Sequence, residues 1–121
     1  MKKKRKSKSN LAERLLNFAV SIIKLVNALP KTVVGKHVRG QLIRSGTSAG
    51  ANYGEACGAE SKSDFTHKLS IVLKELKESR FWLQVINRAE LLKPQRVVPL
   101  LQECEELCAI IAQSIITAKR K

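Results

Sequence analysis

Apolar residues recur along this chain at the three- and four-residue spacing of helices that bury one face. Between residues 11 and 29 the spacing alternates between four and three, which is a heptad seam. Three later stretches carry similar stripes, and prolines stand near the breaks at Pro30 and Pro94. The pattern predicts helices at about 11–29, 33–58, 63–91 and 95–118. Because the links are short, we expect an all-α, antiparallel up-down-up-down four-helix bundle.

Local signals mark the starts of these helices. Asn10 is a plausible N-cap of the first helix, and Thr32 is a plausible cap of the second. The motif Ser61-x-x-Asp64 resembles a capping box before the third helix. Pro94 fits the first turn of the fourth helix, where N–H groups lack intrahelical partners.

Glycines recur every fourth residue in the second predicted helix, at Gly46, Gly50, Gly54 and Gly58. Glycine costs about 1 kcal/mol relative to alanine inside a helix, so this repetition needs a reason. Residues four apart share one face, and a face without side chains lets another helix approach closely. We therefore expect a close helix contact along this stripe. A flexible glycine-rich loop is the alternative.

Polar residues also share a face of this helix, because Arg44, Ser48, Asn52 and Glu55 follow at steps of four, four and three. They are either a solvated face or a polar seam inside the bundle or an oligomer. The third predicted helix supplies charged residues at matching positions. The candidate seam residues are Arg44, Asn52, Glu55, Lys68, Glu75 and Glu78.

The formal net charge of +13 is concentrated at the two ends of the chain. We expect residues 1–9 to be a disordered basic arm, residues 10–118 the bundle, and residues 119–121 a basic tail. Basic arms suit phosphate backbones or anionic surfaces, although a solubilising or localising tail has the same composition. The candidate nucleic-acid-binding residues are Lys2, Lys3, Lys4, Arg5, Lys6, Lys8, Lys36, Arg39, Lys119, Arg120 and Lys121.

The sequence argues against several other classes. Charged residues interrupt the apolar residues near the start, so we expect neither a signal peptide nor a membrane span. Three cysteines without a CxxC pair fit free thiols in a reducing cytoplasm. Asp64-x-x-His67 is the only near-match to a metal motif of helical bundles, and no histidine stands near a candidate nucleophile. We therefore expect a non-enzyme without metal or cofactor.

Several short motifs in the middle of the chain are typical of a known protein family. They are Arg44-Ser45-Gly46-Thr47-Ser48, Ala51-Asn52-Tyr53-Gly54-Glu55-Ala56, Ser61-Lys62-Ser63-Asp64-Phe65, Lys68-Leu69, Lys74-Glu75 and Trp82-Leu83. In these motifs the chain resembles the four-helix-bundle proteins encoded in intervening sequences of 23S ribosomal RNA genes. The resemblance implies a four-helix bundle that assembles into a ring-like homo-oligomer, with a pentamer favoured. A relative, the accessory variability determinant of diversity-generating retroelements, binds nucleic acid and a reverse transcriptase.

Two functional hypotheses follow from these observations. The first is an oligomeric accessory protein that binds RNA or DNA with little sequence preference. Contacts to phosphates position a protein on nucleic acid, and only contacts to base edges read the sequence. The second is an oligomeric scaffold that binds a protein partner such as a reverse transcriptase and does not bind nucleic acid. Both hypotheses predict the same fold, and salt-dependent binding to random RNA and DNA separates them.

Overall fold

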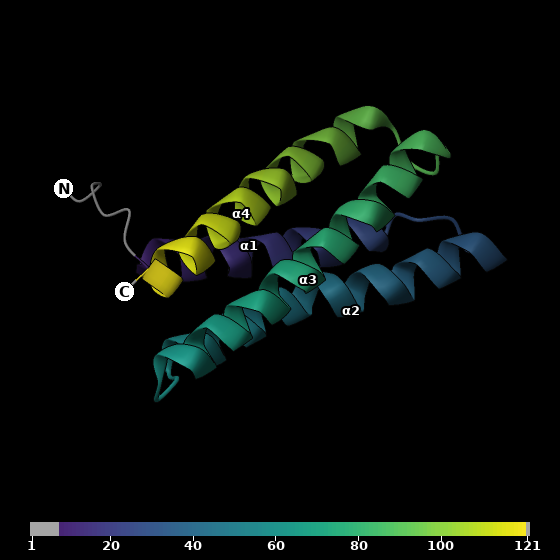
Figure 1. Ribbon diagram of the computed structural model, residues 1–121. Coiled ribbons are helices and arrows are strands. Elements are labelled where there is room, and N and C mark those ends of the chain that lie inside the picture. The colour runs from purple at the N-terminus through teal and green to yellow at the C-terminus, as the bar shows by residue number, and fades with distance from the viewer. Residues whose placement is uncertain (1–7, 121) are drawn as a thin grey trace.

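The computed structural model describes residues 8–120, which form four helices joined by short turns (Figure 1). No strand occurs within this range. The predicted all-α four-helix class is therefore confirmed. The helices are α1, Lys8–Val26; α2, Val33–Cys57; α3, Lys62–Arg88; and α4, Pro94–Arg120.

Two of the predicted caps are confirmed, and one is wrong. The Thr32 hydroxyl oxygen accepts a hydrogen bond from the Gly35 N–H at 3.0 Å at the start of α2. The Ser61 hydroxyl oxygen accepts from the Asp64 N–H at 3.0 Å at the start of α3. Asn10 is not an N-cap, because α1 already begins at Lys8. Nothing in that stretch breaks a helix, so the helix extends past the expected cap.

The helix ends also differ from the predicted bounds for local reasons. α1 ends at Val26, because Pro30 has no N–H to donate to the carbonyl four residues earlier. α3 ends at Arg88, because Glu90 adopts a left-handed backbone with φ 58°. Residues 8 and 9 therefore belong to α1 rather than to the predicted arm. Residues 1–7 and 121 lie outside the described residues.

Each helix packs against its neighbour in the chain, and α1 closes the bundle against α4. Within the described helices, the backbones of the diagonal pairs, α1 with α3 and α2 with α4, do not approach each other closely, so the four helices form a ring around one core. The seams that α3 makes with α2 and α4 are the most extensive, and the α1–α4 seam is the least. The start of α1 and the end of α4 lie at the same end of the bundle (Figure 1).

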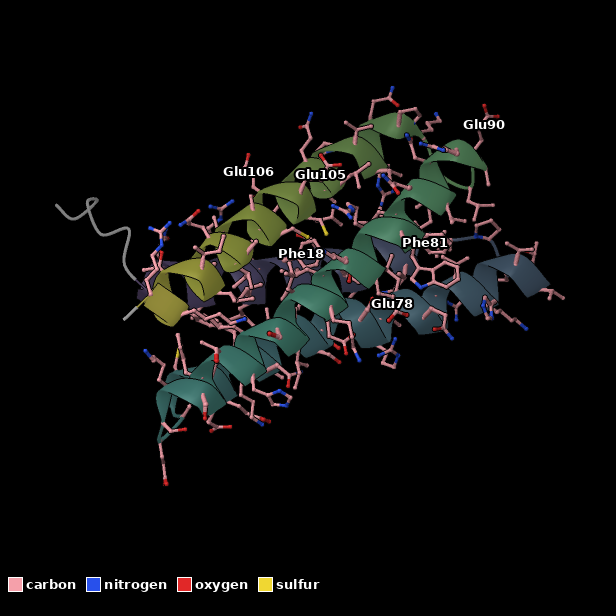
Figure 2. All side chains as sticks on the ribbon, in the orientation of Figure 1. Phe18, Glu78, Phe81, Glu90, Glu105 and Glu106 are labelled. Atoms are coloured by element: carbon pink, nitrogen blue, oxygen red, sulfur yellow. The ribbon has the colours of Figure 1, made fainter. Side chains whose placement is uncertain are left out.

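The core is mostly aliphatic and follows the predicted seams. Every residue of the α1 seam from Leu15 onward is buried, including Phe18, which lies between the helices in Figure 2. Cys104 and Cys108 are buried on the α4 seam as small apolar side chains. The largest fully buried side chains are Phe18, Leu15, Ile22, Leu42, Leu69, Leu76, Leu83, Ile86, Leu107 and Ile111.

A second apolar stripe on α1 is not buried. Leu16, Val20 and Ile23 are 57%, 42% and 43% exposed, and their spacing of four and three places them on one face of the helix. Beside this face, a groove of about 530 Å³ separates α1 from α4 and is lined by Phe18, Leu25 and Pro99, among others. Residues 8–120 therefore leave one side of α1 uncovered.

The glycine stripe makes a close contact at only part of its length. A Cβ on Gly46 would lie 2.9 Å from Ile22 Cγ1 of α1, so this glycine allows the two helices to meet. A Cβ on Gly50 would make ordinary contact with Leu15 at 3.5 Å. The predicted close contact is wrong for Gly54, which has nothing within 4 Å, and for Gly58, which is the exposed C-cap of α2. The stripe turns away from α1 as α2 ends.

A fifth glycine, outside the periodic stripe, has the strictest requirement. A Cβ on Gly35 would lie 1.9 Å from the Pro30 carbonyl oxygen and 2.9 Å from its carbon. Both are backbone atoms of the α1–α2 turn, which therefore cannot move aside as a flexible side chain does. The turn folds back onto the first turn of α2 only because residue 35 lacks a side chain.

We predict that Gly35→Ala destabilises the fold by about 1–3 kcal/mol, since the new methyl group overlaps the turn backbone. Gly54→Ala is the matched control: it makes the same substitution at an open, exposed helical site. It should stabilise the protein by up to about 1 kcal/mol through helix propensity. Urea denaturation midpoints measure both changes. A Gly35→Ala protein as stable as wild type would contradict this account of the turn.

Candidate nucleic-acid interface

The predicted basic ends are only partly within the described residues. Lys119 and Arg120 are exposed in the last turn of α4. Lys8 opens α1, at the same end of the bundle (Figure 1). Lys2, Lys3, Lys4, Arg5, Lys6 and Lys121 lie outside the described residues. The first residues of α1 and the last residues of α4 therefore bring their basic residues to the same end of the bundle (Figure 1).

The two basic candidates of α2 have different surroundings. Lys36 is exposed near the start of the helix, where its ammonium group is free to meet a ligand. Arg39 is half-buried, and its Nε is buried without a hydrogen-bond partner in the described structure. Lys36 therefore fits the predicted role better than Arg39 does.

The predicted polar seam joins α2 to α3. Arg44 of α2 pairs with Glu78 of α3 at 2.6 Å and with Glu75 at 3.3 Å. The Trp82 indole N–H donates to the second carboxylate oxygen of Glu78 at 3.3 Å. These hydrogen bonds, Arg44 first, hold the pKa of Glu78 below its usual value. The Arg44 side chain is 51% exposed, so the pairs lie at the edge of the seam and are partly screened by solvent.

A second ion pair, between Glu55 and Lys68, continues the seam toward the C-terminal end of α2. Asn52, which is also a predicted member of the seam, does not take part in it. Lys68 Nζ lies 2.8 Å from a carboxylate oxygen of Glu55. Asn52 instead donates to the Ser48 carbonyl of its own helix at 2.9 Å. Asn52 is therefore a correction to the predicted seam: its short side chain is satisfied within α2.

The sequence reasoning missed two further polar links between helices. Ser45 of α2 and Ser79 of α3, both fully buried, share a hydrogen bond of 2.8 Å between their hydroxyl oxygens. Arg14 of α1 binds two residues of α4, Glu103 at 2.7 Å and Glu106 at 2.9 Å. The hydrogen bond to Glu103 is the main cause that raises the pKa of Arg14. Neither link has a spacing signal, because the partners lie far apart in sequence.

The sequence patterns also did not predict an aromatic cluster between α2 and α3, away from the end of the bundle where α1 starts. The Trp82 ring on α3 meets two neighbours edge-on: His37 of α2, with ring centroids 5.6 Å apart, and Phe81, at 4.9 Å. Phe81 is 54% exposed. Figure 2 shows it on α3 in the same region as Glu78, whereas Glu105 and Glu106 lie along α4.

Phe81 belongs to an exposed stripe along α3 that the sequence spacing does contain. Lys74, Lys77, Phe81 and Arg88 are all exposed and follow at steps of three, four and seven, which keeps them on one helix face. The acidic residue nearest this face is Glu78, one helical turn from both Lys74 and Phe81, and it is paired with Arg44. The apolar spacing predicts the opposite, buried face of α3, and it gives no indication of a basic stripe on the exposed face.

The described residues hold no group of three or more histidine, cysteine, aspartate or glutamate side chains that could bind a metal ion. None of the described helices is long and apolar enough to cross a membrane. All three cysteines are free; Cys57 is exposed, and Cys104 and Cys108 are buried.

The fold and its cross-helix ion pairs define a small antiparallel four-helix-bundle protein. The chain belongs to the 23S rRNA-intervening sequence protein family, whose model matches residues 7–113. It is similar to a crystal structure from Bacteroides thetaiotaomicron, described as a protein of unknown function from the S23 ribosomal protein family. The two share 34% sequence identity and a TM-score of 0.78, over 87% of this chain and 97% of the other. No protein with a curated function matches the chain.

We predict that Glu78→Gln lowers stability at pH 7, since it removes the anionic partner of Arg44. The pKa of Glu78 is lower in the folded protein than its unfolded value of 4.5. Its contribution is therefore complete above about pH 4.5 and is lost as the pH falls through the folded pKa. The difference between variant and wild type should shrink to nothing in that acidic range.

Thermal unfolding between pH 3 and pH 7 measures this difference. Glu60→Gln is the control, because Glu60 is exposed in the α2–α3 turn and has no hydrogen bond or ion pair in the described structure. A Glu78→Gln protein whose stability deficit stays constant as the pH falls would show that the ion pair does not contribute.

Proposed function

We propose that this protein is a non-enzymatic, homo-oligomeric accessory protein that binds RNA or DNA with low sequence specificity. The observation that carries the proposal is the distribution of charge. Among the described residues, three cations, Arg14, Arg44 and Lys68, form ion pairs with five of the ten acidic residues in the chain. The other twenty basic residues of the chain are therefore balanced by only the five remaining acidic residues, which leaves a large excess of positive charge.

This charge distribution suits a phosphate backbone. Lys36, Lys119 and Arg120 are exposed, and the last two lie at the end of the bundle where α1 begins, shortly after the basic residues 2–6 in the sequence (Figure 1). Contacts to phosphate supply affinity but carry no base sequence, so the binding should be tolerant of sequence. The family description, which refers to intervening sequences of 23S rRNA, is consistent with an RNA partner.

The homo-oligomer is proposed because of the exposed stripe on α1. A soluble monomer rarely exposes a contiguous apolar face, and Leu16, Val20 and Ile23 are covered by no other part of the described chain. The groove beside them, between α1 and α4, is the least packed seam of the bundle. A second copy that packs on α1 would bury both. The family resemblance favours a pentamer, and three free thiols fit a reducing cytoplasm.

The alternative is an oligomeric scaffold that binds a protein partner such as a reverse transcriptase and does not bind nucleic acid. The same exposed stripe on α1 favours this alternative if a different protein covers it. The two candidates differ in one measurable property, which is binding to nucleic acid at low salt.

We predict that deleting residues 1–7 weakens binding to random RNA and duplex DNA and flattens its salt dependence. Five basic residues are lost, and each phosphate contact on duplex DNA contributes about 0.9 to the slope of log affinity against log salt. The slope should therefore fall by up to about 4.5 per chain. Fluorescence anisotropy across a salt series measures it, and a variant with glutamines at Lys2–Lys6 controls for length. If the full-length protein does not bind nucleic acid at low salt, the proposed function is wrong and the scaffold alternative is favoured.

We predict that Val20→Lys reduces the oligomer to a smaller species, because the added charge would be buried in the proposed contact. Light scattering at micromolar concentration reads out the mass. Ser70→Lys adds the same side chain at an exposed site of α3 and should leave the mass unchanged. A monomeric wild-type protein at this concentration would overturn the oligomer.

A further inference from the structure

Trp82 packs against the core of the bundle, but the exposed Phe81 beside it is not explained by that packing. The chain has only five phenylalanine, tyrosine and tryptophan residues, and Phe81 leaves 54% of its surface in solvent. Its ring is held edge-on against Trp82, which in turn is held by His37 and by the hydrogen bond to Glu78. The Phe81 ring is thus exposed to solvent and also packed edge-on against Trp82, an arrangement that suits the stacking of a flat ligand on the Phe81 ring.

Basic residues surround this platform. Lys77 precedes Phe81 by one helical turn, Lys74 by two, and Arg88 follows it by two, all on the exposed face of α3. Lys36 is exposed next to His37 on α2. The acidic residue in contact with the cluster, Glu78, is already bound to Arg44 at 2.6 Å. The face around Phe81 is therefore positive and complementary to phosphate.

We propose that this surface binds single-stranded nucleic acid, with an unpaired base stacked on Phe81 and the flanking phosphates bound by Lys74, Lys77 and Arg88. Aromatic platforms bordered by cations are how proteins bind single strands without reading sequence. A duplex keeps its bases stacked on each other, so it would gain only the phosphate contacts. The inference rests on the proposed function, because it assumes that the protein binds nucleic acid.

The site is distinct from the basic ends of the chain. Phe81 and Arg88 lie toward the C-terminal end of α3, the end of the bundle that carries the α1–α2 and α3–α4 turns, whereas α1 starts and α4 ends at the opposite end (Figure 1). Removing the arm therefore leaves this surface intact, and altering Phe81 leaves the arm intact. The two contributions can be measured separately.

Trp82 provides a direct readout, because it is the only tryptophan in the chain and its ring lies 4.9 Å from Phe81. Oligouridylate, oligothymidylate and a DNA duplex of equal length are titrated into the full-length protein. Anisotropy of the labelled nucleic acid is followed together with Trp82 fluorescence. Both single strands should quench Trp82, while the duplex should bind with little quenching. The uridylate and thymidylate arms show whether RNA or DNA is preferred.

The Phe81→Ala variant should lose about five- to a hundredfold in affinity for the single strands, as expected for one stacked base, with little change for the duplex. Phe81→Leu keeps an apolar side chain but cannot stack, so it should lose affinity as well. The Lys74→Gln, Lys77→Gln double variant should instead flatten the single-strand salt slope by about 1.4.

The remaining outcomes overturn the inference in distinguishable ways. Wild-type protein that binds single strands while Phe81→Ala binds equally well refutes the stacking site and leaves the proposed function standing. If wild-type protein binds no nucleic acid at low salt, both fail. A Phe81→Ala protein with a smaller mass by light scattering and unchanged nucleic-acid affinity would show that a second copy covers this surface instead.

Discussion

The register between α2 and α3 is the constraint on which the rest of the structure depends. Three polar contacts fix it at successive levels: Glu55 with Lys68, Ser45 with Ser79, and Arg44 with Glu78. The serine pair is the most restrictive, because a shift along the helix would leave two buried hydroxyl groups without their shared hydrogen bond. The ion pairs at its edge are partly exposed and add selectivity more than stability. His37 meets Trp82 at the end of the seam because of this register.

Small residues on α2 make this arrangement sterically possible. Ser45, Gly46 and Ala49 are buried, and Gly46 leaves room for Ile22 of α1. One helix can therefore pack closely against two neighbours while it carries polar groups toward α3. A larger side chain at this level would separate α1 from α2 or weaken the polar contacts with α3. The small residues thus serve the packing of the bundle at its centre, and their role ends where Gly54 reaches solvent.

The same polar contacts also organise the charge of the surface. Five carboxylates are held in ion pairs between helices, by three basic residues. With Glu78 paired to Arg44, the outer face of α3 carries the exposed cations Lys74, Lys77 and Arg88. The ion pairs therefore occupy acidic residues that would otherwise offset the positive charge of the surface.

The sequence by itself determined the fold class, the number of helices and most of the core. The heptad spacing of α1 and the caps at Thr32 and Ser61 follow from local sequence signals. The helical spacing also made Arg44, Glu75 and Glu78 candidate members of a polar seam, but it did not decide which of them pair. The end of α1 also follows from the sequence, because the effect of Pro30 on the Val26 carbonyl is local.

Only the tertiary structure decided which members of a pattern are used. The four glycines are equivalent in sequence, yet only Gly46 meets the α1 helix so closely, and Gly35 matters more because a turn folds onto it. Asn52 fits the seam by spacing but bonds within α2, and Ser79 pairs with Ser45 without any signal in the sequence. Spacing specifies the face of a helix. The distance and register of the neighbouring helix decide what that face meets, and both depend on packing between residues far apart in the chain.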